Sequence, residues 1–439
     1  MKIPNNLLEM DVYFDKVIKL LEEWQWIYED RATDILLSDT LNSHFLDFLE
    51  RLDYNELNQL PNGFIKEEWP EKLKNFIKDC NELSLIYETY PYDETSQIKI
   101  PTKVKSKKYL SAKKEHEIYR LADYVVKYCN DNNITRVYDI GSGLGYIDRL
   151  LISCSDLSIV GIESDKSKIE TAIKLDNSLL EKDKLGNITY LGVRLETFTI
   201  EKVFRHIKQY EDNGCIIGLH ACADLTVDTL KLFLLLEKVK SLVLMPCCYH
   251  KVQDNESAII SSLLISKLYP NKMKLINSTF LRLACESTKE RWLTQTEHAH
   301  NYHGFSVLAR AVVQSYMNYK NYKAKRSKNN CITAQHNMQW PQYIKIWLKR
   351  NDILNELNEV VNSDTLETEL LEYWPKYKHL IKRIECFTSL QVCLQSLAES
   401  LLMADKLCYL LQYALKNVNA IRITDPAISP RSLAIVASK

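Results

Sequence analysis

The fold of this chain is decided by the stretch Val137-Tyr138-Asp139-Ile140-Gly141-Ser142-Gly143-Leu144-Gly145-Tyr146-Ile147. An apolar run ends in Asp139, and glycines then follow at positions 141, 143 and 145. The whole chain has ten glycines in 439 residues, so three within five positions indicate a requirement of the backbone. Glycine adopts positive φ and has no Cβ, so a ligand can lie against the main chain. A strand, a glycine-rich turn and a helix form the nucleotide-binding corner of an open α/β sheet.

The residues of this corner favour a cationic ligand over a pyrophosphate. The dinucleotide motif has glycines at its first, third and sixth positions, and here Tyr146 occupies the sixth. The Gly-Lys-Ser/Thr run of a Walker loop is absent from the sequence. A carboxylate at Asp139 would repel phosphate and would attract the sulfonium and α-amino groups of S-adenosylmethionine. S-adenosylmethionine is the methyl donor of methyltransferases. The residues of this stretch that are predicted to bind this donor are Asp139, Gly141, Gly143 and Gly145.

An acidic residue also ends the next predicted strand. Glu163 follows residues 158–162 and lies 22 positions after Gly141. An acid at roughly this spacing accepts hydrogen bonds from ribose hydroxyls, so Glu163 joins the predicted donor site. Glu196, after the third strand, would meet the adenine amino group or would be a surface acid. The alternative for the whole corner is a buried turn that binds no ligand.

Five apolar segments, separated mostly by helical patterns, predict parallel strands joined by crossover helices. They are residues 137–140, 158–162, 188–192, 215–219 and 241–245. A methyltransferase sheet needs two more strands, the last antiparallel, and a strand-turn-strand pattern returns only near the end of the chain, at residues 420–437. The predicted fold class is α/β, with a Rossmann-like seven-stranded sheet.

The rest of the chain is predicted to be mostly helical, with apolar residues recurring at helical spacing. A long apolar segment, residues 387–415, has polar side chains at every fourth position, so it is predicted to be an amphipathic helix and not a membrane span. The predicted parts are an N-terminal helical region (1–105), a methyltransferase core (106–250), a helical insertion covering the site (251–418) and a C-terminal β-hairpin completing the sheet (419–439).

Composition narrows the class of protein further. A hydrophobic content of 46% supports a sizeable core. Lys+Arg and Asp+Glu both number 57, so net charge argues neither for nor against nucleic acid as a partner. Twelve scattered cysteines without a CxxC pair, and a start without an apolar signal sequence, predict a protein with reduced thiols in the cytoplasm or nucleus. No membrane association is expected.

Reactive side chains follow the fourth and fifth predicted strands, where ligands bind in open α/β sheets. The first loop contains His220 and Asp224, and the second contains Cys247, Cys248 and Tyr249. We predict that these five residues line the acceptor pocket. His220 or Asp224 would orient or deprotonate the acceptor, since a histidine side chain is a natural general base. Tyr249 would pack on the acceptor.

Three alternative roles for the two loops stay open. A cysteine could attack C6 of a pyrimidine and so activate C5. Zinc could bind to a set made of Cys222, Cys247, Cys248, His220 and His250, although adjacent cysteines rarely ligate one ion well. The loops could also be structural: Asp224 or Thr226 would then cap the next helix, and the cysteines would be buried as small apolar groups. Acceptor positioning is the favoured role, and no metal is assigned.

The sequence resembles the methyltransferase-like protein 25 family, whose close relatives are called ribosomal RNA adenine dimethylase domain-containing proteins. The resemblance covers roughly residue 20 to the end. It is carried by segments 111–117, 139–145, 218–225, 247–251 and 429–439. It implies a class I S-adenosylmethionine-dependent methyltransferase. The family usually has glycine where Ala223 and Pro246 stand, and His250 also departs from its pattern.

The resemblance leaves the acceptor open between RNA and protein. Adenine amino methylation normally uses an Asn/Asp-Pro-Pro-Tyr-type loop after the fourth strand, and residues 220–223 differ from it. A more distant similarity runs to acceptor-stem tRNA 2′-O-methyltransferases, which have a His-Leu-Cys-Gly loop and a Cys-Cys-His loop at the same strand ends. A different class is a non-catalytic scaffold that binds a partner through its helical regions.

Overall fold

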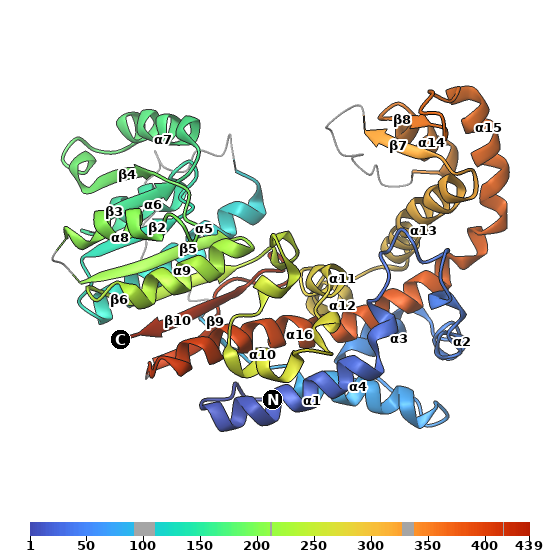
Figure 1. The fold of residues 1–439 in the computed structure, drawn as a ribbon, viewed down its shortest axis with the longest axis horizontal. Helices are drawn as coiled ribbons and strands as arrows, with labels where there is room; N and C mark the ends of the chain where they lie inside the picture. The colour runs from blue at the N-terminus through green and yellow to red at the C-terminus, as the bar shows by residue number, and fades with distance from the viewer. Residues whose placement is uncertain (92–109, 211–212, 327–337, 416) are drawn as a thin grey trace. The chain divides into compact units, whose positions relative to one another are not determined.

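The computed structural model describes residues 1–91, 110–210, 213–326, 338–415 and 417–439. The chain, whose helices and strands are labelled in Figure 1, divides into two compact units. The first contains Met1–Glu22, Glu82–Thr288 and Gln395–Lys439, and the second contains Glu23–Asn81 and Lys289–Leu394. Both the predicted N-terminal region and the predicted insertion therefore contribute residues to both units. The predicted boundary at residue 105 lies outside the described residues.

The first unit is built on an eight-stranded sheet with the strand order β1-β9-β10-β6-β5-β2-β3-β4. The strands are β1 (Glu88–Thr89), β2 (Arg136–Ile140), β3 (Ser158–Glu163), β4 (Ile188–Gly192), β5 (Gly214–Ala221), β6 (Val239–Pro246), β9 (Asn417–Arg422) and β10 (Leu433–Ser438). Neighbouring strands from β6 to β4 are parallel, and β10 is antiparallel to both β6 and β9. The five predicted parallel strands and the predicted C-terminal hairpin are confirmed.

The prediction of seven strands is wrong by one. The additional strand, β1, comes from the N-terminal region, which was predicted to be helical. It pairs in parallel with the outer edge of β9, and Tyr90 N donates to Arg422 O at 2.8 Å. A strand of two residues is too short to show an alternating pattern, so only its pairing partner reveals it.

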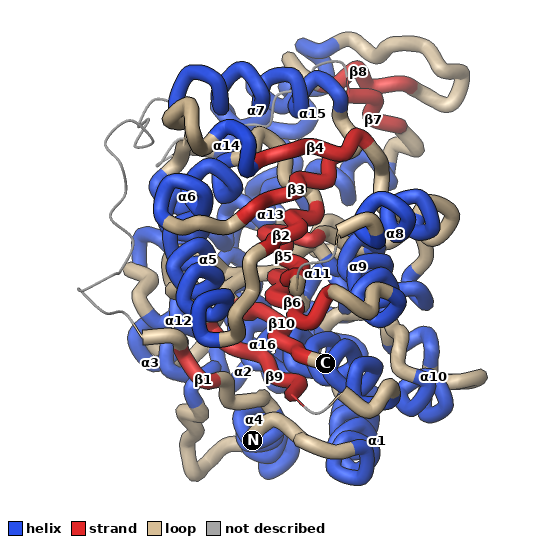
Figure 2. The backbone as a smooth tube through the Cα atoms, turned by 90° about the vertical axis from the view of Figure 1, so that its left-hand side faces the viewer, coloured by secondary structure: helices blue, strands red, loops and turns tan. Residues whose placement is uncertain are grey.

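Helices cover both faces of this sheet (Figure 2). Among them, α5 (Ala112–Asp131) and α6 (Tyr146–Cys154) lie on one face, and α8 (Ile200–Lys208) and α9 (Asp224–Leu235) lie on the other. Apolar residues of α5 and α6, including Leu121, Val125 and Leu150, form a core with Val137 and Ile159 of the sheet. The remaining α-helices lying wholly in this unit are α7 (Lys166–Leu179), α10 (Ser262–Leu268) and α11 (Ser278–Leu283). Its 3-10 helices are η4 (Leu185–Asn187), η5 (Tyr249–Lys251), η6 (Asn255–Ala258) and η7 (Met273–Leu275).

Three helices contribute residues to both units: α1 (Leu7–Glu23), α4 (Glu71–Leu83) and α16 (Ile381–Gln412). The long apolar segment predicted at 387–415 is therefore a helix. In the first unit, its buried Asp405 accepts hydrogen bonds from the Ile260 and Ser261 main-chain amides at 3.0 and 2.9 Å. These bonds connect the segment that follows β6 to the C-terminal part of α16.

The second unit is mainly helical, as predicted. It contains α2 (Phe45–Leu49), α3 (Tyr54–Gln59), α12 (Lys289–Leu293), α13 (Glu297–Tyr319), α14 (Trp340–Leu348) and α15 (Ser363–Tyr373), with η1 (Gln25–Ile27), η2 (Thr40–Asn42), η3 (Leu60–Asn62), η8 (Trp374–Lys376) and η9 (Lys378–Leu380). The sequence did not predict its antiparallel pair β7 (Lys323–Arg326) and β8 (Asn351–Leu354). The four residues of β7 are all exposed and three are basic, so no alternating apolar pattern marks the strand.

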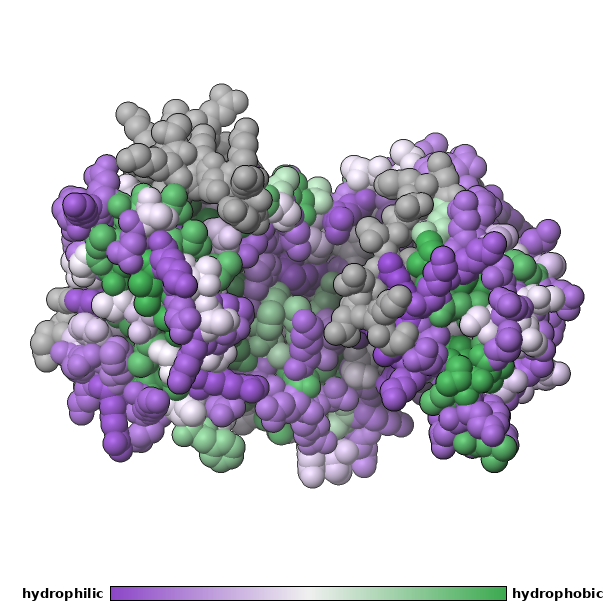
Figure 3. All heavy atoms as spheres, turned by 90° about the horizontal axis from the view of Figure 1, so that it is seen from above, coloured by the Kyte–Doolittle hydropathy of each residue, from purple (hydrophilic) through white to green (hydrophobic). Residues whose placement is uncertain are grey.

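Among the described residues, no helix combines the length and the apolar character needed to cross a membrane. The face of the molecule in Figure 3 is covered mostly by hydrophilic residues, with hydrophobic ones in smaller groups.

Candidate active site

A cavity of about 680 Å³ lies at the carboxyl ends of β2, β3 and β5, where ligands bind in open α/β sheets. Its walls come from the loops that follow β2, β3, β4 and β5 and from residues 251–257. Of the residues predicted for the donor and acceptor sites, it is lined by Gly141, Glu163, His220 and Asp224. Glu196 and Cys222 also line it. Residues from two separately predicted sites therefore share one cavity.

The glycine loop turns sharply between β2 and α6. Gly141, Gly143 and Gly145 have φ values of 75°, 60° and 68°, a region that residues with a Cβ rarely adopt. A Cβ on Gly145 would overlap the Tyr190 hydroxyl, so this glycine is required by packing. A Cβ on Gly143 would meet nothing closer than Gly141 O at 3.9 Å. The main chain at Gly143 therefore leaves room for a ligand, whereas the main chain at Gly145 is already covered by the Tyr190 side chain.

Glu163 fixes this loop to the next one. Its Oε2 accepts a hydrogen bond from Gly143 N at 3.0 Å, and its Oε1 accepts one from Asp165 N at 2.9 Å. The side chain is buried, yet it lines the cavity. A carboxylate held in this way keeps further lone pairs for donors that enter the cavity.

Asp139 does not line the cavity but lies buried behind it. Its Oδ1 has no hydrogen-bond partner among the described residues, and neither does either carboxyl oxygen of Asp148, a buried residue of α6. Burial raises the pKa of Asp139 to about 7, the adjacent Asp148 carboxyl opposes this rise, and the charge of Glu163 adds to it. Burial and the charge of Asp139 raise the pKa of Asp148 well above its usual range. Two buried carboxyl groups that repel each other leave at least one protonated.

His220 forms a hydrogen-bonded pair with an acid from a distant part of the chain. Its φ of 62° is unusual for a residue with a side chain, and its ring Nε2 lies 2.8 Å from Glu117 Oε2. Glu117 belongs to α5 and is buried, and the hydroxyl of Ser429 donates to its Oε1. Burial raises the pKa of Glu117, but the hydrogen bonds from His220 and Ser429 outweigh this and hold the pKa below its usual value. A buried carboxylate thus orients an imidazole that faces the cavity.

Asp224, the first residue of α9, has both carboxylate oxygens occupied. Oδ2 accepts from Gln253 N at 3.0 Å, and Oδ1 accepts from the Ser257 hydroxyl at 2.9 Å. It holds residues 253–257 in the cavity wall, and Ala223, not Asp224, is the N-cap of α9. The structure therefore shows a wall-building role for Asp224, while its predicted role toward the acceptor stays a prediction.

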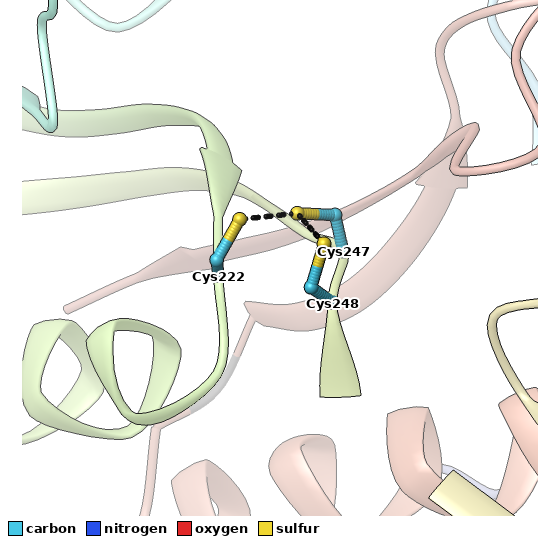
Figure 4. Close-up of side chains that lie close together, drawn as sticks. All are labelled: Cys222, Cys247 and Cys248. Atoms are coloured by element: carbon cyan, nitrogen blue, oxygen red, sulfur yellow. Dashed lines mark hydrogen bonds between the residues drawn. The ribbon is translucent and has the colours of Figure 1, made fainter. Parts of the chain in front are cut away.

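The cysteines of the two loops lie close together, but only Cys222 reaches the cavity. Its Sγ lies 2.8 Å from Cys247 Sγ, which lies 3.6 Å from Cys248 Sγ (Figure 4). A hydrogen bond from Cys247 lowers the pKa of Cys222 to about 6 against the effect of burial, and it raises the pKa of Cys247. Tyr249 is buried with its hydroxyl unpartnered among the described residues, and neither it, Cys247 nor Cys248 lines the cavity.

Glu117, Asp148 and Ser429 were missed from the sequence. Glu117 could have been found, because it lies four and eight positions before Leu121 and Val125 and so shares the apolar face of α5. An acid on such a face indicates a buried partner. Asp148 and Ser429 carry no comparable pattern, because only the folded chain brings them to the site.

The strand order, the single antiparallel strand, the glycine loop after β2 and the acid at the end of β3 define a Rossmann-like methyltransferase fold. Residues 113–255 match the family described as "Methyltransferase domain", so the chain contains such a domain. The resemblance noted in the sequence is also confirmed. The chain is 27% identical over 253 residues to probable methyltransferase-like protein 25 of Mus musculus, a match covering 53% of this chain and 38% of that protein.

The human relative gives nearly the same match. Probable methyltransferase-like protein 25 of Homo sapiens is 27% identical over 252 residues, covering 53% of this chain and 38% of the relative. The chain thus spans well under half the length of these two relatives. A solved structure of coclaurine N-methyltransferase bound to N-methylheliamine and SAH is 14% identical, with 88% of this chain and 95% of that chain covered at a TM-score of 0.23. Because this structural similarity is low, we assign the fold class from the strand order of the sheet.

Proposed function

We propose that this chain is an S-adenosylmethionine-dependent methyltransferase that acts on an RNA or protein acceptor. The observation that carries the proposal is the single cavity that joins the glycine loop and Glu163 to the His220–Glu117 pair. A donor site and a proton-accepting group in one cavity are the two parts that methyl transfer to a hydroxyl or amine needs.

The residues present fit S-adenosylmethionine, which supplies an electrophilic methyl group on a sulfonium when bound. The main chain at Gly141 and Gly143 leaves space for a ligand. Glu163 would accept hydrogen bonds from the ribose hydroxyls, and Glu196 would accept one from the adenine amino group. The oxygen of Asp139 that has no partner among the described residues lies behind the same loop and would favour a cationic ligand through its charge.

On the acceptor side, His220 would take the proton of the attacking group. Glu117 would act as a positioning residue, because it holds the ring by Nε2 and is itself held by Ser429. The strained backbone at His220 supports this role, since such conformations persist where the surrounding structure imposes them. All eleven cysteines in the described residues lack disulfides, which supports the proposed location in the cytoplasm or nucleus.

The test is methyl transfer by the purified chain with radiolabelled S-adenosylmethionine and fractionated RNA and protein from cells that lack it. We expect His220→Ala to lower kcat by about 10²–10⁴-fold, the usual contribution of a positioned base, with unchanged affinity for S-adenosylhomocysteine. Glu117→Gln should shift the pH–rate profile. His206→Ala, on α8, is the control and should match wild type. A wild-type rate in His220→Ala would contradict the proposed base, and absence of S-adenosylhomocysteine binding to wild type would favour the scaffold alternative.

Affinity for S-adenosylhomocysteine is expected to rise with pH. The pKa of Asp139 is about 7 in the folded chain, so at pH 6 about one molecule in eleven has the ionised form that attracts the ligand ammonium. If binding needs ionised Asp139, the dissociation constant of S-adenosylhomocysteine should fall about tenfold between pH 6 and pH 8. The contribution of Asp139 to stability should move the other way, because this carboxyl holds its proton up to about pH 7 in the folded state and only up to about pH 4 in the unfolded state. Calorimetric titration of wild type and Asp139→Asn measures this, and an equal pH slope in both would refute it.

A further inference from the structure

Three cysteines, of which Cys222 lines the cavity, converge from the ends of two neighbouring strands. Ala221, the last residue of β5, pairs with Pro246, the last residue of β6. Cys222 and Cys247 directly follow these two residues. The Sγ atoms of Cys222, Cys247 and Cys248 all lie within 4.8 Å of one another. Figure 4 shows the three side chains pointing toward a common centre from the two strand ends.

A turn brings two adjacent cysteines to this centre. Neighbouring side chains of an extended strand point to opposite faces. Here the chain turns at Cys248, whose φ and ψ are −85° and 70°, and Tyr249 N donates to Cys247 O at 3.0 Å. This is an inverse γ-turn, which places both sulfurs on one side, 3.6 Å apart. The usual objection to adjacent cysteines as ligands of one ion therefore does not apply.

The other loop is held in a costly conformation. His220 and Ala223, on either side of Cys222, have φ values of 62° and 55°. Each such residue costs on the order of 1–3 kcal/mol and is usually found where function requires it. The strained loop directs Cys222 toward the β6 loop.

We propose that Cys222, Cys247 and Cys248 bind one zinc ion, whose fourth position is filled by water or an acceptor atom in the cavity. Three thiolates are soft ligands that suit zinc, and sites with three protein ligands and one open position are typical of catalytic zinc. Among the described residues, no fourth His, Cys, Asp or Glu ligand atom joins this group. Cys222 lines the cavity, so an open position on that side can meet a substrate.

The three sulfur atoms are already as close together as one metal ion requires, since all lie within 4.8 Å of one another. Tetrahedral zinc with Zn–S bonds of about 2.3 Å separates its sulfurs by about 3.8 Å. The Cys247–Cys248 distance is already 3.6 Å, and the Cys222–Cys247 distance must open from 2.8 Å by about one ångström. A disulfide between Cys222 and Cys247 would use only two of the three sulfurs. It would not explain why the sulfur of Cys248 lies beside them.

The experiment measures metal binding directly and does not depend on methyl transfer. The reduced full chain is titrated with zinc and, separately, with cobalt, followed by elemental analysis and X-ray absorption. We expect one zinc per chain, three sulfur neighbours at about 2.3 Å, and a thiolate-to-cobalt charge-transfer band. Cys222→Ser and Cys248→Ser should each lower zinc affinity by more than about 100-fold, beyond the loss seen for outer-shell partners.

Cys285→Ser is the matched control. Its thiol donates to Cys247 O at 3.3 Å, but it lies outside the cluster, so this variant should bind zinc like wild type. Wild-type protein without stoichiometric zinc, or Cys248→Ser with unchanged affinity, would overturn the proposal. The proposal would also be overturned if the reduced chain bound no zinc and oxidation removed two hydrogens to form a Cys222–Cys247 disulfide. If the serine variants do not fold, the sulfur count on wild-type protein decides, and S-adenosylhomocysteine titration of the same sample reports separately on the proposed donor site.

Discussion

Gly141→Arg is expected to abolish binding of S-adenosylhomocysteine without unfolding the chain. Gly141 lines the cavity, and a Cβ there would meet only the Leu225 side chain at 3.5 Å, an ordinary contact. The backbone cost of a side chain at positive φ is about 1–2 kcal/mol, which a folded domain of this size tolerates. The arginine would then fill the donor site with bulk and positive charge. We expect the dissociation constant to rise at least about 100-fold, or about 2.7 kcal/mol.

Calorimetric titration with S-adenosylhomocysteine measures this loss, and circular dichroism confirms the fold. Gly186→Arg is the matched control, because nothing lies within 4 Å of a Cβ at Gly186 and its φ is not positive. It should bind as tightly as wild type. Binding retained in Gly141→Arg would show that the ligand does not contact the glycine loop, and the donor site would have to be placed elsewhere.

Glu399→Ala is expected to destabilise the sheet unit by about 3–5 kcal/mol, the cost of leaving one member of a buried ion pair without its partner. Arg431 is buried, and its Nη1 lies 2.6 Å from Glu399 Oε1. The same guanidinium donates to the carbonyls of Ala284 and Glu286. The pair joins α16 to the segment before β10 and to the residues after α11, so all three lose a common anchor.

Urea unfolding measures the loss, and hydrogen exchange of residues 417–439 shows where it acts. Glu201→Ala is the control, because Glu201 and Arg205 form an exposed ion pair on α8 with a separation of 2.9 Å. Exposed pairs contribute little, so this variant should scarcely move the midpoint. If both variants unfolded at the same urea concentration, the buried pair would have no special part in stability.

The parallel strands could be predicted from sequence because each is a buried apolar run between helical patterns. The C-terminal hairpin could be placed because an incomplete sheet still needed two strands. The pairs that escaped prediction have no such pattern. Only two residues form β1, and β7 consists of four exposed residues of which three are basic. Their strand character comes from pairing with distant residues, which local sequence does not encode.

The site shows the same division. Gly141, Glu163, His220 and Asp224 lie at or just after the carboxyl ends of strands. The topology of a parallel sheet brings these ends together, so their shared cavity could be predicted. Tyr249 also follows a strand, but the γ-turn at Cys248 directs the chain so that its ring is buried. Side-chain direction after a strand depends on the turn, and residue spacing alone does not determine it.

The antiparallel strand β10 lies between β6 and β9, so it completes the centre of the sheet, not its rim. Until residues 433–438 dock, the main-chain N–H and C=O groups along one edge of β6 have no partner, although nearly every residue of this strand is buried in the finished fold. The two strands are nearly 200 residues apart in sequence, and such long-range pairing forms late and slowly. A folding intermediate with the parallel strands already formed would therefore expose an unpaired strand edge that can pair with another chain and aggregate. Refolding yield should fall with protein concentration and recover when a chaperone shields that edge.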